Sequence, residues 1–308
     1  MAVPYGTVRA YVTGGAGFVG THLQAHLAAA GDDVTSADRL TDGVDITDAL
    51  STLDHMSAAA PDVVYHLAGQ ADVGGSWDTP VETFNINLYG TLNVLEAARR
   101  CGARRVIAVT SADIYGQVTA EQLPLTETAE LRPVSPYAAS KAAADMACLQ
   151  AFLGYGQEVI RVRAFNHLGP GQGPRFVASA LAQRVARNEV SGDSTVMVGD
   201  LTPRRDFTDV RDVARAYRML ALDGAPGEAY NICSGVDHSI QDIADGLLGL
   251  SDHPMELCVD DDLLRPVDLP ILRGSAEKLS AATGWSPDIP LSTTLADLLN
   301  WHRSEIPS

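Results

Sequence analysis

The chain has 308 residues, of which 46% are hydrophobic and 20% charged, a composition typical of a globular protein with a sizeable core. Its formal net charge of −17 excludes nucleic acid and anionic membrane as the main partners. No apolar run reaches the length of about 18 residues that a membrane-spanning helix requires. The segment before the first glycine cluster is too short for a signal peptide, so a cytoplasmic protein is expected. Widely spaced cysteines without a Cys-x-x-Cys motif predict reduced thiols and no metal site; they are Cys101, Cys148, Cys233 and Cys258.

A glycine-rich turn lies near the start of the chain. Residues 8–12 form a β-rich run, then Gly14, Gly17 and Gly20 follow, and residues 22–27 have helical spacing. Strand, glycine turn and helix in this order are the context of a dinucleotide-binding fingerprint, although a plain connection between strand and helix is the alternative. The glycines would let the chain turn, let backbone N–H groups approach a pyrophosphate, and let the helix pack on the strand.

The second predicted strand covers residues 33–37 and ends at Asp38 and Arg39. An acidic residue about 20 positions after the glycines can bind the adenosine ribose hydroxyls, which suits NAD. Arg39 could instead bind a 2′-phosphate, so NAD(H) is favoured and NADP(H) stays open. Further along, Thr47 or Asp48 can cap a helix.

Two further predicted strands end in small or polar residues. Residues 63–67 lead into Ala68 and Gly69, and small residues at a strand end let a flat cofactor approach. Residues 105–109 lead to Ser111, at the edge where open parallel sheets bind their ligands. Ser111 could donate a hydrogen bond to a substrate oxygen, although a serine at a strand end is also a common turn residue.

Tyr137 and Lys141 are four residues apart at the start of an Ala-rich helical pattern. Residues with this spacing share one face of a helix. A free phenol loses its proton at a pH of about 10, which is too high for a base at neutral pH. A neighbouring ammonium favours the phenolate, so the pair predicts a proton shuttle for a carbonyl/alcohol couple. An exposed tyrosine and lysine on an amphipathic helix is the alternative.

Together these motifs resemble the extended short-chain dehydrogenase/reductase family of nucleotide-sugar epimerases, dehydratases and reductases. Residues 13–20, residues 66–69, Ser111 and the Tyr137/Lys141 pair occur in the family's order, and the resemblance covers nearly the whole chain. It implies that Tyr137 exchanges the proton, Lys141 lowers the pKa of Tyr137 and holds the nicotinamide ribose, and Ser111 orients the carbonyl. It further implies an NAD(H) or NADP(H) cofactor that contacts Tyr137 and Lys141 as well as Gly14, Gly17, Phe18, Val19, Asp38, Arg39, Asp45, Ile46, Leu67 and Ala68.

The second half narrows the resemblance. Residues 163–172, 199–212 and 230–235 resemble the branch of the family that acts on GDP-mannose derivatives. Within that branch, residues 264–270 and 283–287 are most similar to reductases of GDP-linked 4-dehydro-6-deoxy-mannose.

The residues after Ser111 argue against dehydration. Dehydratases of this family carry Asp or Ser, then Glu, directly after the Ser/Thr, to supply an acid and a base. Ala112 cannot donate a proton, and Asp113 is one methylene shorter than Glu. Reduction and 4-epimerisation both remain, since they need only the catalytic triad and the cofactor.

Arginines beside Gly- or Pro-rich loops stand out in an acidic protein. Guanidinium groups match phosphate geometry, although a solvated loop or a surface ion pair is the alternative for each. The resemblance favours a diphosphate contact for Arg205 and Arg265. The predicted substrate contacts are Asp113, Asn166, Arg175, Arg205 and Arg265.

The predicted fold is α/β, a Rossmann-type doubly wound parallel sheet with a smaller C-terminal α/β lobe. Residues 1–165 would form the dinucleotide-binding domain, joined by sheet elements between residues 205 and 235, and residues 166–308 would mainly form the substrate lobe.

The predicted reaction is NAD(P)H-dependent reduction of the C4 ketone of a nucleoside-diphosphate 4-dehydro-6-deoxyhexose. The alternatives are an NAD-dependent 4-epimerase, a less favoured 4,6-dehydratase, and a catalytically silent nucleotide-binding scaffold. By resemblance to the family, helices within residues 88–100 and 137–153 would pair in a homodimer.

Overall fold

The computed structural model describes residues 7–263 and 269–306. Arg265, one of the predicted substrate contacts, lies outside these described residues. Among the residues described, no helix has the length and apolarity needed to cross a membrane.

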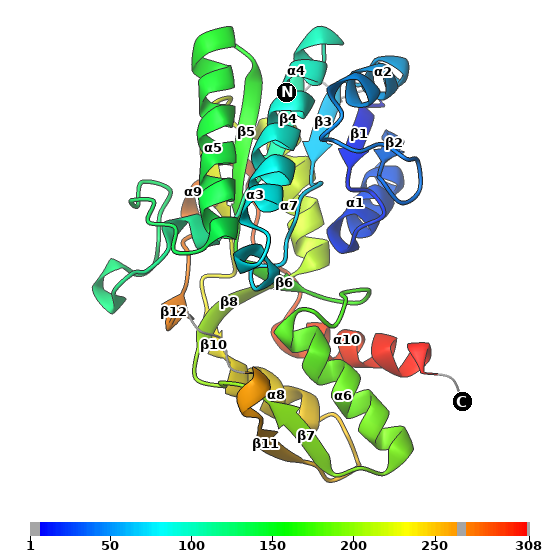
Figure 1. Cartoon of the computed structure of the whole chain (residues 1–308), viewed down its shortest axis with the longest axis vertical. Helices are drawn as coiled ribbons and strands as arrows, with labels where there is room; N and C mark the ends of the chain where they lie inside the picture. Colours follow the sequence, from blue (N-terminus) through cyan, green and yellow to red (C-terminus); the bar gives the residue numbers. More distant parts are fainter. Residues whose placement is uncertain (1–6, 264–268, 307–308) are drawn as a thin grey trace.

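A parallel sheet of six strands forms the larger part of the molecule, in the order β2-β1-β3-β4-β5-β9 (Figure 1). Its strands alternate with helices along the chain, so the predicted Rossmann-type α/β fold is confirmed. The carboxyl ends of parallel strands lie at one edge, and this is where Thr13, His66 and Val109 end their strands. The strands are β1 (Arg9–Thr13), β2 (Asp33–Ala37), β3 (Val63–His66), β4 (Arg105–Val109), β5 (Glu158–Ala164) and β9 (Ala229–Ile232).

Helices cover both faces of this sheet. Successive strand residues point to opposite faces, so Ile107 packs with α1 (Phe18–Ala29) and α7 (Val210–Asp223). Its neighbours Val106 and Ala108 pack in a second core on the other face. That face is covered by α2 (Ala49–Ala59), α4 (Gly90–Arg100) and α5 (Pro136–Tyr155).

The helix predicted within residues 88–100 is preceded by an irregular helical turn. A short α3 (Pro80–Phe84) leads into a π-helical turn, η2 (Asn85–Tyr89), before α4 begins. Such turns often lie at functional sites, and this one packs against α5.

The smaller lobe lies beyond the carboxyl ends of the sheet strands (Figure 1). Strand β8 pairs with β10, β12 and β6, and β11 pairs with β7. The lobe has its own core, in which Leu181, Ile243 and Leu298 from three helices pack together. Its elements are β6 (Asn166–Leu168), α6 (Val177–Ser191), β7 (Thr195–Val198), β8 (Arg204–Asp209), β10 (Asp237–Ser239), α8 (Ile240–Leu248), β11 (Glu256–Val259), β12 (Ile271–Leu272) and α10 (Leu291–Glu305).

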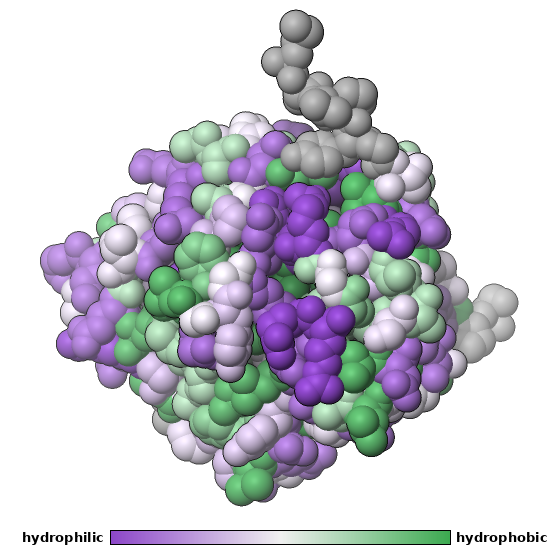
Figure 2. Space-filling model, turned by 90° about the horizontal axis from the view of Figure 1, so that it is seen from above, coloured by the Kyte–Doolittle hydropathy of each residue, from purple (hydrophilic) through white to green (hydrophobic). Residues whose placement is uncertain are grey.

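The two parts of the molecule are interwoven along the chain. After β6 and α6, the chain returns through β8 and α7 to the edge strand β9 of the large sheet. The short helix α9 (Glu277–Thr283) then packs against α7. Seen from the end of the sheet opposite the lobe, polar and apolar side chains are interspersed over the surface (Figure 2).

Candidate active site

The glycine turn connects β1 to α1 and lies against the end of β3. Gly14 has a φ of 72°, and a Cβ there would come within 2.8 Å of the Ala68 backbone N. A Cβ at Gly20 would overlap the carbonyl oxygens of Gly14 and Gly15. Gly17 precedes the first residue of α1 and caps it without any side chain. The turn therefore depends on the absence of side chains, and the first N–H groups of α1 have no side-chain cap.

These features fit a dinucleotide. An uncapped helix N-terminus behind glycines accepts phosphate oxygens through backbone N–H groups and the helix dipole. Phe18 and Val19 are the first residues of that helix, and both are partly exposed. Leu67 and Ala68, at the end of β3, face the same turn.

Asp38 lies directly after β2, and its two carboxylate oxygens are partly engaged. They accept hydrogen bonds from Ala16 N at 3.2 Å and from Leu40 N at 2.9 Å. Asp38 thus holds the strand end beside the glycine turn, in the position expected for a ribose contact. Arg39 is exposed next to it.

The segment after Arg39 contains the predicted helix cap, while the cofactor contact of Asp45 stays a prediction. Asp48 caps α2 by accepting hydrogen bonds from Leu50 N and Ser51 N. Asp45 accepts from Thr47, and these bonds lower the pKa of Asp45.

Ile46, one of the predicted cofactor contacts, is 6% exposed and belongs to the core between α2, α4 and the sheet. Its side chain packs against Gly90: a Cβ at position 90 would come within 2.5 Å of Ile46 Cδ1.

Helix α5 presents Tyr137 and Lys141 on its buried face. It begins at Pro136 behind Ser135, whose hydroxyl accepts a hydrogen bond from Ala138 N. Pro at the first helical position and Ser at the cap are both favourable, so the helix start is well defined by the sequence. Tyr137 is 9% and Lys141 8% exposed, so the interpretation of an exposed pair is wrong.

Ser111 lies at the end of β4 and meets Tyr137. Its hydroxyl accepts a hydrogen bond from Asp113 N at 3.1 Å, and it caps the short 3-10 helix η3 (Ala112–Tyr115). The Ser111 hydroxyl also lowers the pKa of Tyr137, so the structure places near each other two hydroxyls that are 26 positions apart in the chain.

The acidity of Tyr137 differs from the sequence-based prediction. Burial raises the pKa of Tyr137 above its ordinary value, the Asp113 carboxylate raises it further, and the Ser111 hydrogen bond lowers it. The net shift is upward, opposite to the lowering predicted from the Lys141 ammonium. Burial instead lowers the pKa of Lys141 to about 8.

Lys141 points to the ends of β3 and β4. Its Nζ donates to Val109 O at 3.1 Å, and a Cβ at Gly69 would come within 3.2 Å of Nζ. The ammonium therefore lies between the strand that carries Ser111 and the strand next to the glycine turn, where a nicotinamide ribose is expected.

A set of polar residues that was not predicted from the sequence holds the start of α5. Asn87, on the π-helical turn, donates to Ser140 Oγ at 2.9 Å, and Ser140 donates to Tyr137 O at 2.7 Å. Tyr137 N in turn donates to Ser76 Oγ at 3.2 Å. In the sequence, the available sign of these contacts was the polar side chain of Asn87 within residues 85–91. Its burial and its hydrogen-bond partners are determined only by the fold.

The predicted substrate residues lie on the lobe side of the same edge. Asn166 is exposed at the start of β6, and Arg175 is exposed before α6. Arg205 is half-buried on β8 and donates to Leu269 O at 2.6 Å and to Arg204 O at 2.9 Å. Asp113 is half-buried, and the charge of its carboxylate raises the pKa of Tyr137.

Of two histidines next to apolar runs, His66 is buried and His167 is half-buried. His66 bonds to Thr13 and Thr91 hydroxyls at 2.9 Å, and burial, followed by the charge of Lys141, lowers its pKa to about 3. Burial also lowers the pKa of His167, which bonds to Phe165 O. Both imidazoles are therefore neutral at physiological pH.

The fold and this arrangement are those of a dinucleotide-dependent short-chain dehydrogenase/reductase. The sequence profile of the NAD dependent epimerase/dehydratase family matches residues 10–233, and the chain belongs to this family.

Among curated relatives, the GDP-6-deoxy-D-mannose reductase of Pseudomonas aeruginosa is 37% identical, covering 97% of this chain and 99% of that protein. A UDP-glucose 4-epimerase of Mycolicibacterium smegmatis is 29% identical with the same coverage.

Two similar solved structures contain a bound dinucleotide. RMD from Pseudomonas aeruginosa complexed with NADPH has a TM-score of 0.90 and 38% identity, covering 97% of this chain and 100% of that chain. The Thermus thermophilus UDP-glucose 4-epimerase complex with NAD has a TM-score of 0.87 and 32% identity, covering 96% and 99%. Relatives with each of the two dinucleotides are thus known.

Proposed function

We propose that the protein reduces the C4 ketone of a nucleoside-diphosphate 4-dehydro-6-deoxyhexose with NADPH or NADH. The proposed substrate is GDP-4-dehydro-6-deoxy-mannose and the product GDP-6-deoxy-mannose. The observation that carries the proposal is the 37% identity to a GDP-6-deoxy-D-mannose reductase over nearly the full length of both chains.

In the proposed mechanism, Tyr137 gives its phenolic proton to the oxygen of the C4 ketone as that oxygen becomes an alcohol. Ser111 donates a hydrogen bond to the same oxygen and orients it. When bound, the nicotinamide dinucleotide supplies the hydride. Lys141, with its ammonium near Gly69 and Val109, binds the ribose and holds a positive charge beside the site.

The residues proposed to hold the dinucleotide form one continuous edge. Backbone N–H groups of Phe18 and Val19 would bind the pyrophosphate, and Asp38 with Arg39 the adenosine ribose. The carboxylate of Asp38 favours free ribose hydroxyls, and Arg39 can accommodate a 2′-phosphate, so both dinucleotides fit. The remaining proposed contacts are Gly14, Gly17, Asp45, Ile46, Leu67 and Ala68.

The nucleotide sugar would lie between this edge and the lobe formed mainly by residues 166–308. Arg175 and Asn166 are exposed at the lobe side and available to a diphosphate or sugar. Arg205, with Arg265 beyond the described residues, completes the proposed basic contacts. Asp113, whose charge acts on Tyr137, would bind a sugar hydroxyl next to C4.

Dehydration is disfavoured by the side chains beside the phenol. Ala112 has no acidic group, and Asp113 is the only acid on η3. Loss of water from C6 needs both an acid and a base in addition to Tyr137. Reduction needs neither, which agrees with the residues present.

The stoichiometry of dinucleotide oxidation separates the proposal from its rivals. A reductase oxidises one external NADPH or NADH per sugar reduced, so absorbance at the nicotinamide band falls in proportion to product. A 4-epimerase, favoured by the relatives of that activity, interconverts its sugars without net absorbance change. A nucleotide-binding scaffold binds without turnover. A panel of 4-keto and 4-hydroxy sugar nucleotides with each dinucleotide distinguishes all three outcomes.

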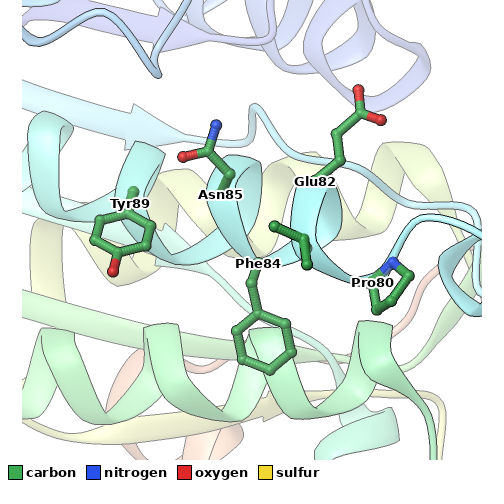
Figure 3. Close-up of a pocket in the computed structure, with 6 residues that line it drawn as sticks. Pro80, Glu82, Phe84, Asn85 and Tyr89 are labelled. Carbon is green, nitrogen blue, oxygen red and sulfur yellow. The ribbon is translucent and has the colours of Figure 1, made fainter.

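We also propose a homodimer through α4 and α5, which lie side by side on one face of the sheet (Figure 1). Large apolar side chains are exposed there, and Leu153 is 72% exposed. An open pocket beside α3 adds to this surface: its Phe84 points toward α5 (Figure 3). The other large exposed apolar residues of α3, η2, α4 and α5 are Val81, Tyr89, Leu92, Met146 and Tyr155.

The dimer proposal is tested by light scattering after size-exclusion chromatography. The parent is expected at twice the chain mass, and Leu153→Glu, which places a charge on the apolar face, is expected to shift it toward the monomer. A parent protein that stays monomeric at all concentrations contradicts the proposal.

We place the enzyme in the cytoplasm. Its four cysteines are free in the structure, and Cys258 is exposed. Free thiols suit a reducing compartment.

A further inference from the structure

A buried acid on α5 extends the face that carries Tyr137 and Lys141. Asp145 lies four residues after Lys141, just as Lys141 lies four residues after Tyr137. The side chain of Asp145 is 0% exposed. Its carboxylate accepts a hydrogen bond from Arg161 Nη1 at 2.7 Å and two from Arg163, whose Nε and Nη2 both lie at 3.1 Å. A carboxylate bound by two guanidinium groups is fixed in direction as well as in position.

The two arginines belong to β5 and point to the same face of the sheet, since they are two residues apart. Arg163 also reaches beyond Asp145: its Nη1 donates to Tyr115 OH at 3.2 Å and to Glu127 O at 2.9 Å. Burial disfavours the Arg163 guanidinium, but the bonds to Asp145 outweigh it and raise the pKa of Arg163.

Tyr115 extends the connection to the edge of the sheet and to η3. Its hydroxyl donates to Asn231 Oδ1 on β9 at 2.6 Å. Tyr115 also ends η3, the helix that begins after Ser111 and carries Asp113. The ion pairs of Asp145 therefore join α5 to β5, and the hydrogen bonds of Arg163 and Tyr115 continue this connection to β9 and to η3. The segment of η3 bears Ser111 and Asp113, two residues of the proposed site.

A further contact links Asp145 to the residue before Ser111. Thr110 Oγ1 lies 3.5 Å from Asp145 Oδ2, at the limit of a hydrogen bond. The backbone N and the hydroxyl of Thr110 both donate to Val162 O, at 2.7 and 2.9 Å. One end of the Asp145 carboxylate is thus near the strand that carries Ser111, while its own helix carries Tyr137.

Apolar packing alone determines the rotation and translation of α5 only weakly. The face that it buries is composed largely of small side chains, which do not interdigitate deeply, and apolar burial is non-directional. Buried ion pairs are better suited to fixing a register than to adding stability, because desolvation offsets much of their attraction. The small buried residues are Ala138, Ala144, Cys148 and Ala151.

We propose that Asp145 is a positioning residue: through Arg161 and Arg163 it sets the separation between the hydroxyls of Ser111 and Tyr137. Its effect on turnover rests on the proposed function, whereas its effect on the separation does not.

The first test compares Asp145→Asn with Asp32→Asn. Asp32 is a matched control because its side chain is 4% exposed, it pairs with Arg218 at 2.7 Å, and it precedes β2 at the opposite ends of the strands. Both variants lose a buried charge pair and are expected to unfold at a lower temperature. Only Asp145→Asn is expected to lower kcat per active site, by about 10- to 100-fold, because displacement of reacting groups by about 1 Å has effects of this size.

The Michaelis constant for the dinucleotide should stay within about two-fold in Asp145→Asn, since the glycine turn is untouched. A double-mutant cycle with Ser111→Ala then tests the route of the effect. If Asp145 acts by placing Ser111 against Tyr137, removing Ser111 in the Asp145→Asn background costs much less than in the parent. Independent losses that multiply contradict the proposal.

Arg163→Lys decides the question should Asp145→Asn fail to fold. It keeps the positive charge but loses the planar fork, so it is expected to lower kcat by about 3- to 10-fold while remaining folded. A kcat equal to that of the parent in either folded variant overturns the proposal.

Crystal structures of the parent and of the same variants give a readout without substrate. A Ser111 Oγ to Tyr137 Oη separation that changes in Asp145→Asn or Arg163→Lys, but not in Asp32→Asn, supports the proposal. An unchanged separation contradicts it. If the parent turns over no sugar nucleotide, the proposed function fails, and the crystal structures still decide whether Asp145 positions these hydroxyls.

Discussion

The two sides of the proposed cleft are built in opposite ways. On the dinucleotide side, Gly14, Gly17 and Gly20 form a turn in which backbone atoms lie where side chains would otherwise be. On the catalytic side, the helix that carries Tyr137 and Lys141 is held by buried polar side chains on several elements. Substitutions that add side-chain atoms are expected to disrupt the dinucleotide side, and substitutions that remove side-chain atoms are expected to disrupt the catalytic side. This difference predicts which substitutions affect binding and which affect turnover.

The largest effect is expected at the glycine turn. Gly14→Ala combines a positive φ with a Cβ 2.8 Å from the Ala68 backbone N. Strain and overlap together should destabilise the fold by about 2–6 kcal/mol, and dinucleotide binding should weaken more than ten-fold, by about 1.4 kcal/mol or more. Chemical denaturation and quenching of NADPH fluorescence measure the two effects.

Gly31→Ala is the matched control for this substitution. Gly31 has a φ of 85°, but a Cβ there meets nothing within 4 Å. Its cost should be confined to backbone strain of about 1–3 kcal/mol, with dinucleotide affinity unchanged. Equal effects of the two substitutions would show that the close approach to Ala68 is unimportant.

On the catalytic side, a smaller effect is expected from titration of Lys141. Burial lowers its pKa to about 8, so the ammonium is present below this pH and is lost above it. We therefore predict that kcat/KM falls as pH rises through about 8. In Lys141→Arg the side chain stays charged over this range, and any remaining activity should lose that alkaline limb. If the alkaline fall in kcat/KM persists unchanged in Lys141→Arg, it is caused by the titration of another group.

An effect on stability alone, which develops only below pH 6.5, is expected from His66, which lies between the two sides. Its pKa is lowered from 6.5 to about 3, so the unfolded state binds a proton that the folded state excludes across this interval. The contribution of neutral His66 to stability is complete above pH 6.5 and is lost as pH falls toward 3, by about 1.4 kcal/mol per pH unit. His66→Gln should show a correspondingly shallower fall in unfolding free energy below pH 6.5. Parallel pH curves for parent and variant contradict this assignment.

The features that could be predicted from the sequence are local ones. The glycine turn, the Asp48 cap and the Tyr137/Lys141 spacing each lie within a few residues, where backbone geometry and helix periodicity determine what is near what. The order of strands and helices likewise sufficed to predict the Rossmann-type sheet.

The features that were missed depend on contacts between distant segments. Asp145 meets Arg161 and Arg163 only because α5 packs on β5, and nothing in the sequence marks Asp145 as buried. Arg205 was predicted as a phosphate contact, but its guanidinium also bonds to the carbonyl of Leu269, a contact that spacing cannot reveal. The raised pKa of Tyr137 follows from burial, which the Tyr-x-x-x-Lys pattern does not specify.

The most direct test compares the parent with Tyr137→Phe, each mixed with GDP-4-dehydro-6-deoxy-mannose and NADPH or NADH. The parent should oxidise one dinucleotide per ketone reduced. Tyr137→Phe should bind the dinucleotide as tightly but turn over about 10²- to 10⁴-fold more slowly, because it lacks the proton donor. A Tyr137→Phe protein that reduces the sugar as fast as the parent would contradict the account.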